Sequence, residues 1–241
     1  MDSGKREITD NGAIAKIRGK TRVRKLLFWL CIDLVVAVAV LVLLLYRPGR
    51  YDPAGLESAN PERGQVSSYL THELSPQFYN GAQRGEPFDL VITQKGVNEI
   101  VAGWGWPVMS EGIMLYAPAV LFVPGSVVLM GTVNIKGVEL VVSIELRPSI
   151  NEHGLSNLSV AQVKIGAMNI TPLAKIMAKR MYAQRIAAAS ADSKALYAKI
   201  AASLLNDEPF EPVFEVDDRK VRIEKITVHQ EKITAHLVPA S

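Results

Sequence analysis

The sequence predicts an α+β protein, with an N-terminal transmembrane helix followed by a curved antiparallel sheet wrapped on one or two helices. Three observations lead to this class. One long apolar stretch lies near the N-terminus, short segments of alternating apolar residues fill the middle and the end of the chain, and two helical stretches separate these segments. With 241 residues, 49% of them hydrophobic, the chain is long enough to bury a core and too apolar to be disordered.

The apolar stretch at residues 26–46 has the length and composition of a membrane span. Its only charged residue is Asp33, and a helix of this length extends about 31 Å, close to the roughly 30 Å thickness of the hydrocarbon core. Residues 1–25 hold eight basic and three acidic side chains, whereas only Arg47 and Arg50 follow closely. The positive-inside rule therefore predicts a basic cytoplasmic tail at 1–25 and an extracytoplasmic chain after Tyr46, in a single-pass protein of the cell membrane.

A cleaved signal peptide is the competing interpretation of this stretch. The apolar run is longer than a usual signal-peptide core, and residues 42–46 offer no cleavage site of small residues. A lipoprotein signal is disfavoured because the bulky Leu30 precedes Cys31. The sequence therefore favours an uncleaved signal anchor.

The exported part begins with a segment of turn-forming composition. Residues 47–87 contain five prolines and five glycines, which predicts a tether with a short helix near 66–74. The extracytoplasmic domain is expected at 88–241. Its first strand, 88–93, ends at Thr93, a residue suited to cap a helix whose apolar residues then recur at helical spacing.

The uncharged stretch 112–135 is predicted to form strands at about 113–122 and 126–135, because five prolines and glycines would break a second membrane-spanning helix. After Lys136-Gly137 the residues alternate strictly, which predicts a hairpin with one apolar side. Its other side carries Glu139, Ser143, Glu145 and Arg147. The remaining expected elements are strands at 155–165, 221–228 and 233–238, and helices at about 171–189 and 194–205.

The sequence lacks motifs for catalysis or metal binding. The four histidines have no metal-ligand spacing, and one cysteine excludes an internal disulfide or a Cys-based zinc site. No nucleophile elbow, Walker sequence or dinucleotide fingerprint is found. We therefore expect no enzyme, no catalytic residue, no metal, no cofactor and no nucleic-acid partner. An anchored hydrolase stays open as an alternative, because a catalytic cluster assembled only in three dimensions leaves no motif.

Two regions stand out from this background. A segment rich in Trp and Met suits an adaptable apolar groove, and equally an ordinary packed core. The helical region 172–205 carries six basic residues and one acidic residue, which suits contact with anionic headgroups or a solvated helix face. The candidate lipid-binding residues are Trp104, Trp106, Met109, Met114, Leu115, Phe122 and Met130, and the candidate headgroup contacts are Lys175, Lys179, Arg180 and Arg185.

Four segments also carry a family resemblance: the strand and helix of 88–100, the turn and strand of 124–131, the turn of 147–155, and the strand and helix start of 163–172. In these segments the chain resembles the YpmS-like family of single-span bacterial envelope proteins and, more loosely, the tubular lipid-binding (TULIP-like) folds. The resemblance implies a long curved sheet wrapped on a helix, with an apolar channel for acyl chains and no catalytic residues.

Together these observations predict a membrane-anchored extracytoplasmic protein that binds or transfers lipid or another amphiphile. The alternative is a non-enzymatic interaction or scaffold module in the assembly of the cell envelope. A packed core and a ligand channel use the same residue types, so the sequence leaves this choice open.

Overall fold

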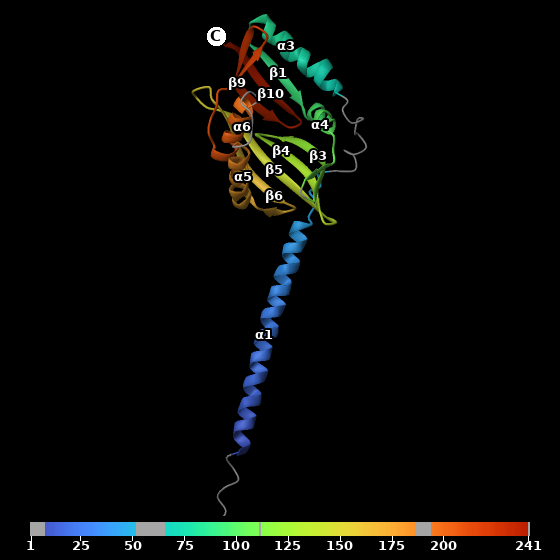
Figure 1. Ribbon diagram of the computed structural model, residues 1–241, viewed down its shortest axis with the longest axis vertical. Helices are drawn as coiled ribbons and strands as arrows, with labels where there is room; N and C mark the ends of the chain where they lie inside the picture. Colours follow the sequence, from blue (N-terminus) through green and yellow to red (C-terminus); the bar gives the residue numbers. More distant parts are fainter. Residues whose placement is uncertain (1–7, 52–65, 111, 187–193, 241) are drawn as a thin grey trace, which may run out of the picture. The chain divides into compact units, whose positions relative to one another are not determined.

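The computed structural model describes residues 8–51, 66–110, 112–186 and 194–240, which form two units, Met1–Leu44 and Leu45–Ser241 (Figure 1). The first unit is helix α1 (Ile8–Leu44). Its part Arg24–Leu44 is long and apolar enough to cross a membrane, and the side chains of residues 24–43 are exposed. The predicted N-terminal apolar helix is therefore confirmed, and it is compatible with membrane anchoring.

The second unit combines helices with two antiparallel sheets, as the predicted α+β class requires. The four-stranded sheet has the order β1-β10-β9-β8, and the six-stranded sheet has the order β2-β3-β4-β5-β6-β7. Neither order closes into a barrel. The elements are η1 (Tyr69–Leu74), α3 (Ser75–Arg84), β1 (Phe88–Thr93), α4 (Gln94–Ala102), β2 (Val108–Ser110), β3 (Ile113–Val123), β4 (Ser126–Ile135), β5 (Val138–Ile150), β6 (Ser156–Ile165), β7 (Met168–Asn169), α5 (Thr171–Ile186), α6 (Lys194–Asn206), β8 (Val213–Val216), β9 (Arg219–His229) and β10 (Lys232–Ala240).

Helix α3 covers one face of the four-stranded sheet. Ala82 of α3 is buried together with Leu90, Ala235 and Leu237 of β1 and β10. A Cβ atom added at Gly81 would lie 2.4 Å from the ring of Phe88, so the helix approaches the strand more closely than a larger residue allows. This contact makes α3 part of the domain core.

Turn chemistry fixes the hairpins of the six-stranded sheet. Lys136 and Gly137 have φ angles of 52° and 89°, as a two-residue hairpin turn needs. In β3 the pairing with β4 skips from Tyr116 to Ala119, and Ala117 at this bulge has a φ of 47°. The register of β3, β4 and β5 follows from these two features.

Helix α4 protects the edge of β3 beyond the short strand β2. The Asn98 amide nitrogen donates to the Val120 carbonyl oxygen at 2.8 Å, and its amide oxygen accepts from the Val120 nitrogen at 2.7 Å. The Phe122 nitrogen donates to the Gln94 side-chain oxygen at 2.7 Å. Two amide side chains thereby replace the neighbouring strand that β2 is too short to provide.

The strands expected at 88–93 and 126–135 have those same bounds in the structure, and Thr93 caps α4 by accepting from the Gly96 nitrogen at 3.1 Å. The segment 47–87 differs from the expected tether. It contributes α3 to the core, and Tyr51 is buried in the second unit. The tether was expected because of the proline and glycine content of this segment. A single aromatic residue such as Tyr51 can nevertheless fix such a segment to the domain. Residues 52–65 lie outside the described part of the chain.

Candidate functional site

The six-stranded sheet has two chemically different faces, because paired residues share a face and faces alternate along each strand. One face, here called the apolar face, has apolar side chains or glycine at each paired position from Ile113 to Phe122, Val127 to Ile135 and Val138 to Ile150. From β6 it receives Leu158, Val160, Val163 and Ile165, with Ser156 at its end. Its members in β3 to β5 are Ile113, Leu115, Val120, Phe122, Val127, Leu129, Gly131, Val133, Ile135, Val138, Leu140, Val142, Ile144, Leu146, Pro148 and Ile150.

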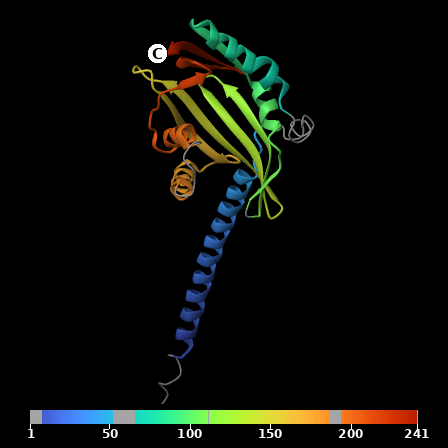
Figure 2. The same cartoon turned by 45° about the horizontal axis from the view of Figure 1, so that its top comes forward.

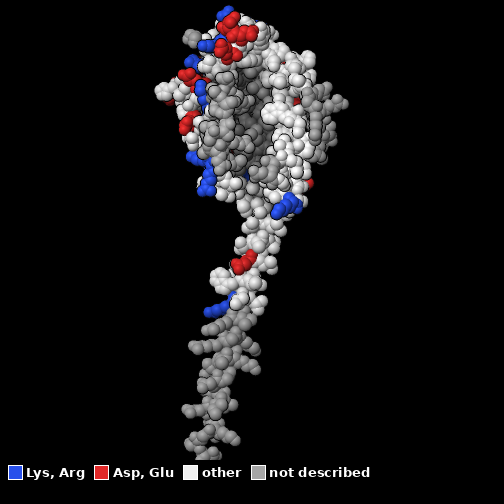
Figure 3. Space-filling view, viewed as in Figure 1, with Lys and Arg blue, Asp and Glu red and all other residues white. Residues whose placement is uncertain are grey.

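Much of the apolar face is open rather than packed. Phe122, Val120 and Val163 are buried, but Leu129 in the middle of β4 is 36% exposed. Most of the other side chains on this face are half-buried. Figure 3 shows the molecule hollowed over β4 and β5, with the coloured charged side chains mainly outside the hollow. An apolar groove therefore lies over the middle strands.

Helices border this groove on two sides. Val97 and Val101 of α4 pack near Val120 and Phe122 at the β3 side. At the β6 side, α5 and α6 lie beside the sheet (Figure 2). Ser203 of α6 is fully buried, and its hydroxyl accepts from the Leu158 nitrogen at 2.8 Å. The two outer strands of this set, β3 and β6, are thus contacted by different helices.

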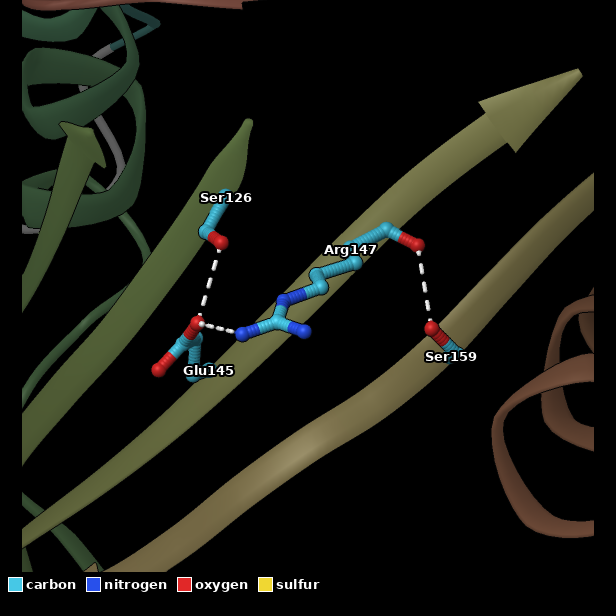
Figure 4. Close-up of polar contacts among 4 residues, drawn as sticks. All are labelled: Ser126, Glu145, Arg147 and Ser159. Atoms are coloured by element: carbon cyan, nitrogen blue, oxygen red, sulfur yellow. Dashed lines mark hydrogen bonds and ion pairs between the residues drawn. The ribbon is translucent and has the colours of Figure 1, made fainter. Parts of the chain in front are cut away.

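The opposite face, here called the mixed face, carries polar and charged side chains. Ser126 donates to a Glu145 carboxylate oxygen at 3.0 Å, and Arg147 donates to the same oxygen at 3.2 Å (Figure 4). A pocket of about 330 Å³ lies on this face. Its polar lining comes mainly from Arg50, Ser143, Glu145, Gln162 and Lys164, and its apolar lining mainly from Leu121, Val128 and Met130.

The chain segment after Leu45 is fixed to the mixed face. The Tyr51 hydroxyl donates to the Ala117 carbonyl oxygen at 2.7 Å and lies 2.8 Å from the Thr132 hydroxyl oxygen. Arg47 donates to Glu139 at 2.6 Å. The Tyr116 hydroxyl, together with Arg47, lowers the pKa of Glu139 below its ordinary value despite a smaller desolvation effect in the opposite direction. In its described part, this segment therefore covers part of the mixed face and none of the apolar face.

The structure separates the candidate lipid-binding residues. Leu115 and Phe122 lie on the apolar face, with Phe122 in the core, whereas Met109, Met114 and Met130 lie on the mixed face. Trp104 is 69% exposed, and the Trp106 indole nitrogen donates to the Val101 carbonyl oxygen at 2.8 Å.

The groove is built instead from aliphatic residues that the sequence reasoning did not select, with Leu129, Val142 and Ile144 near its middle. The alternation of residues along 127–146 is the sequence signal for these residues. When the two strands of this hairpin are paired, the alternation places all these side chains on one face of the sheet.

The candidate headgroup contacts lie on α5. Lys179 and Arg180 are exposed, and Lys175 is half-buried. The side chain of Arg185 lies outside the described part of the structure. Leu173, Ile176 and Met177 on the same helix are each more than half exposed. This helix therefore presents apolar and basic side chains to the surroundings.

Among the described residues, no three His, Cys, Asp or Glu side chains are placed to hold a metal ion. The closest polar grouping is on the four-stranded sheet, where His236 Nδ1 lies 2.6 Å from Asp89 and its Nε2 lies 3.8 Å from Glu224. Asp89 and Glu224 are more than half exposed, so this grouping is a surface contact between strands.

Comparison with protein-family models, curated proteins and solved structures finds no match to this chain. The resemblance to the YpmS-like and TULIP-like proteins therefore stays a prediction.

Proposed function

We propose that this protein is a membrane-anchored, extracytoplasmic, non-enzymatic protein that binds or transfers lipid or another amphiphile, and that the acyl chain lies on the apolar face. One observation carries the proposal. Four adjacent strands present apolar side chains at their paired positions, and the central residue Leu129 is 36% exposed instead of buried under another layer. Open apolar surfaces of this extent mark binding sites.

The groove is long enough for an acyl chain. Between Val138 and Leu146 the strand β5 advances by eight residues, or about 27 Å. An acyl chain that fills one leaflet spans about 15 Å, half of the hydrocarbon core. Each methylene group removed from water contributes about 0.8 kcal/mol, so ten or more methylene groups outweigh the cost of ordering the chain.

The apolar part of α1 supports the membrane location. Residues 24–44 have the length of a span, and the basic residues that precede them favour a cytoplasmic N-terminus. The second unit follows within the next few residues. A lipid-binding domain that follows a membrane span in the chain has the lipids of that membrane close at hand.

Native mass spectrometry of the full-length protein, extracted in a mild detergent, tests the proposal. We expect a population whose mass exceeds that of the chain by one lipid molecule. The substitution Ile144→Asp places a carboxylate in the groove and is expected to remove this population, because a buried charge without a partner is strongly disfavoured. Ser143→Asp is the matched control, since it changes the adjacent residue on the mixed face.

Two results would contradict the proposal. One is a wild-type protein that is free of lipid after gentle extraction, which would favour the scaffold alternative. The other is an equal loss of lipid in both variants, which would show that the apolar face is not the binding surface. Circular dichroism of each variant verifies that the fold is retained.

A further inference from the structure

The end of the six-stranded sheet that follows the anchor carries a row of exposed apolar side chains. Ile113 pairs with Ile135, and Ile135 pairs with Val138, so the three side chains lie next to one another across β3, β4 and β5. Their exposed fractions are 40%, 39% and 50%. We call Ile113, Ile135 and Val138 the tip residues.

The tip residues are the last row of the apolar face. The next rows inward are Leu115 with Val133 and Leu140, and then Gly131 with Val142. Apolar surface therefore continues without a polar side chain from the tips to the middle of the groove. An acyl chain that enters at the tip residues remains in contact with apolar atoms along this path.

Only a short stretch of chain separates helix α1 from this end of the sheet. Helix α1 ends at Leu44, and Arg47 is bound to Glu139, the residue after the tip residue Val138. Three residues of chain extend at most about 10 Å. If a membrane span ends at Leu44, this length limits how far the tip residues can lie from the leaflet surface.

We propose that the tip residues, at the start of β3 and at the β4–β5 turn, insert into the leaflet next to the anchor and form the portal through which an acyl chain passes between bilayer and groove. This proposal rests on the proposed function. The partner is the lipid bilayer. Lys136 at the β4–β5 turn is exposed and basic, so its amine extends to phosphate groups while the apolar side chains next to it enter the hydrocarbon.

Depth-dependent quenching tests the portal in the full-length protein. Cys31, the native cysteine, is replaced by alanine, and single cysteines are introduced by Ile113→Cys, Val138→Cys and His153→Cys. Each is labelled with the environment-sensitive dye NBD and reconstituted into phospholipid vesicles that contain nitroxide-labelled acyl chains. His153 is the matched control, because it is exposed in the turn at the other end of β5.

We expect a blue-shifted emission and the loss of most of the fluorescence at positions 113 and 138, and no quenching at position 153. Equal emission and equal quenching at the three positions would overturn the portal. So would quenching of position 153 alone, because the domain would then face the bilayer with its other end.

A second measurement separates the portal from the groove. The double variant Ile135→Asp, Val138→Asp is expected to lose lipid uptake from vesicles but to keep lipid that is supplied in mixed detergent micelles. Uptake from vesicles at the wild-type rate would overturn the portal and leave the groove intact. If the wild type binds no lipid in micelles, the proposed function fails, whatever the quenching at the tips.

Discussion

Glu99 joins two helices through a single carboxylate. One of its oxygens accepts hydrogen bonds from the Tyr69 nitrogen at 3.0 Å and from the Ser67 hydroxyl at 2.8 Å. The backbone N–H of Tyr69, followed by the Ser67 hydroxyl, lowers the pKa of Glu99 below its ordinary value. The start of η1 is thereby attached to α4, which in turn holds the edge of β3.

This carboxylate predicts a pH-dependent stability. Because the pKa of Glu99 is lower in the folded state, its contribution is present at neutral pH and is lost as the pH falls through about 4 and below. Glu99→Gln is expected to lower the free energy of unfolding by about 1 kcal/mol at pH 7, since the group is partly screened by water. The difference should vanish in acid.

Thermal unfolding of the full-length protein in detergent, followed by near-ultraviolet circular dichroism between pH 3 and pH 7, measures this effect. Glu152→Gln serves as the control, because Glu152 lies in an exposed turn. A difference between Glu99→Gln and wild type that stays constant across this pH range would contradict the assignment.

Single residues were hard to assign to a site from the sequence. Met130 and Leu129 are adjacent and both apolar, yet Met130 is buried beneath Tyr51 and Leu129 opens into the groove. Tyr51 is nearly 80 residues away in the chain, so no local pattern reveals which face it covers. The candidate lipid-binding residues were chosen by residue type, whereas strand pairing decides on which face of the sheet each of them lies.

At the scale of elements, hydrophobic period and turn residues were sufficient for the longer strands. The alternation after Lys136-Gly137 correctly predicted the β4–β5 hairpin and its two faces. Strands β2, β7 and β8 were not predicted, because two to four residues are too few to establish a period. Helix α3 was missed because its segment is rich in proline and glycine, although Ala82 is buried in the core.

Helix α5 predicts a dependence on lipid charge. If its basic residues contact headgroups, its backbone amides exchange more slowly in nanodiscs of anionic lipid than in zwitterionic ones. Lys179→Glu with Arg180→Glu should abolish this difference. Each basic residue near an anionic surface contributes about 1 kcal/mol, so loss of the two basic residues corresponds to a roughly thirtyfold change in protection.

Hydrogen–deuterium exchange of the full-length chain measures this protection. Lys220→Glu with Lys225→Glu is the control, because these two exposed residues lie on β9 of the other sheet. Protection of α5 that is equal in both lipids for the wild type would refute the headgroup contact.

At the scale of the whole molecule, the charge distribution predicts the orientation. By the positive-inside rule, we expect the eight basic residues before the span to keep the N-terminus in the cytoplasm, with the second unit outside. A reporter enzyme that is active only outside the membrane is expected to work when it is fused after Ser241 and to be inactive when it is fused before Met1. An externally active N-terminal fusion would reverse the topology.

The division of the sheet into two faces also limits which insertions and substitutions the polypeptide can accept. Inserting one residue into β4 or β5 would exchange the faces beyond that point and turn polar side chains of β4, or charged side chains of β5, into the groove. Inserting two residues in each strand of the hairpin keeps every face and lengthens the groove by about 7 Å. Substitutions among aliphatic residues keep the apolar character of the groove, whereas the length of the groove changes in steps of two residues per strand.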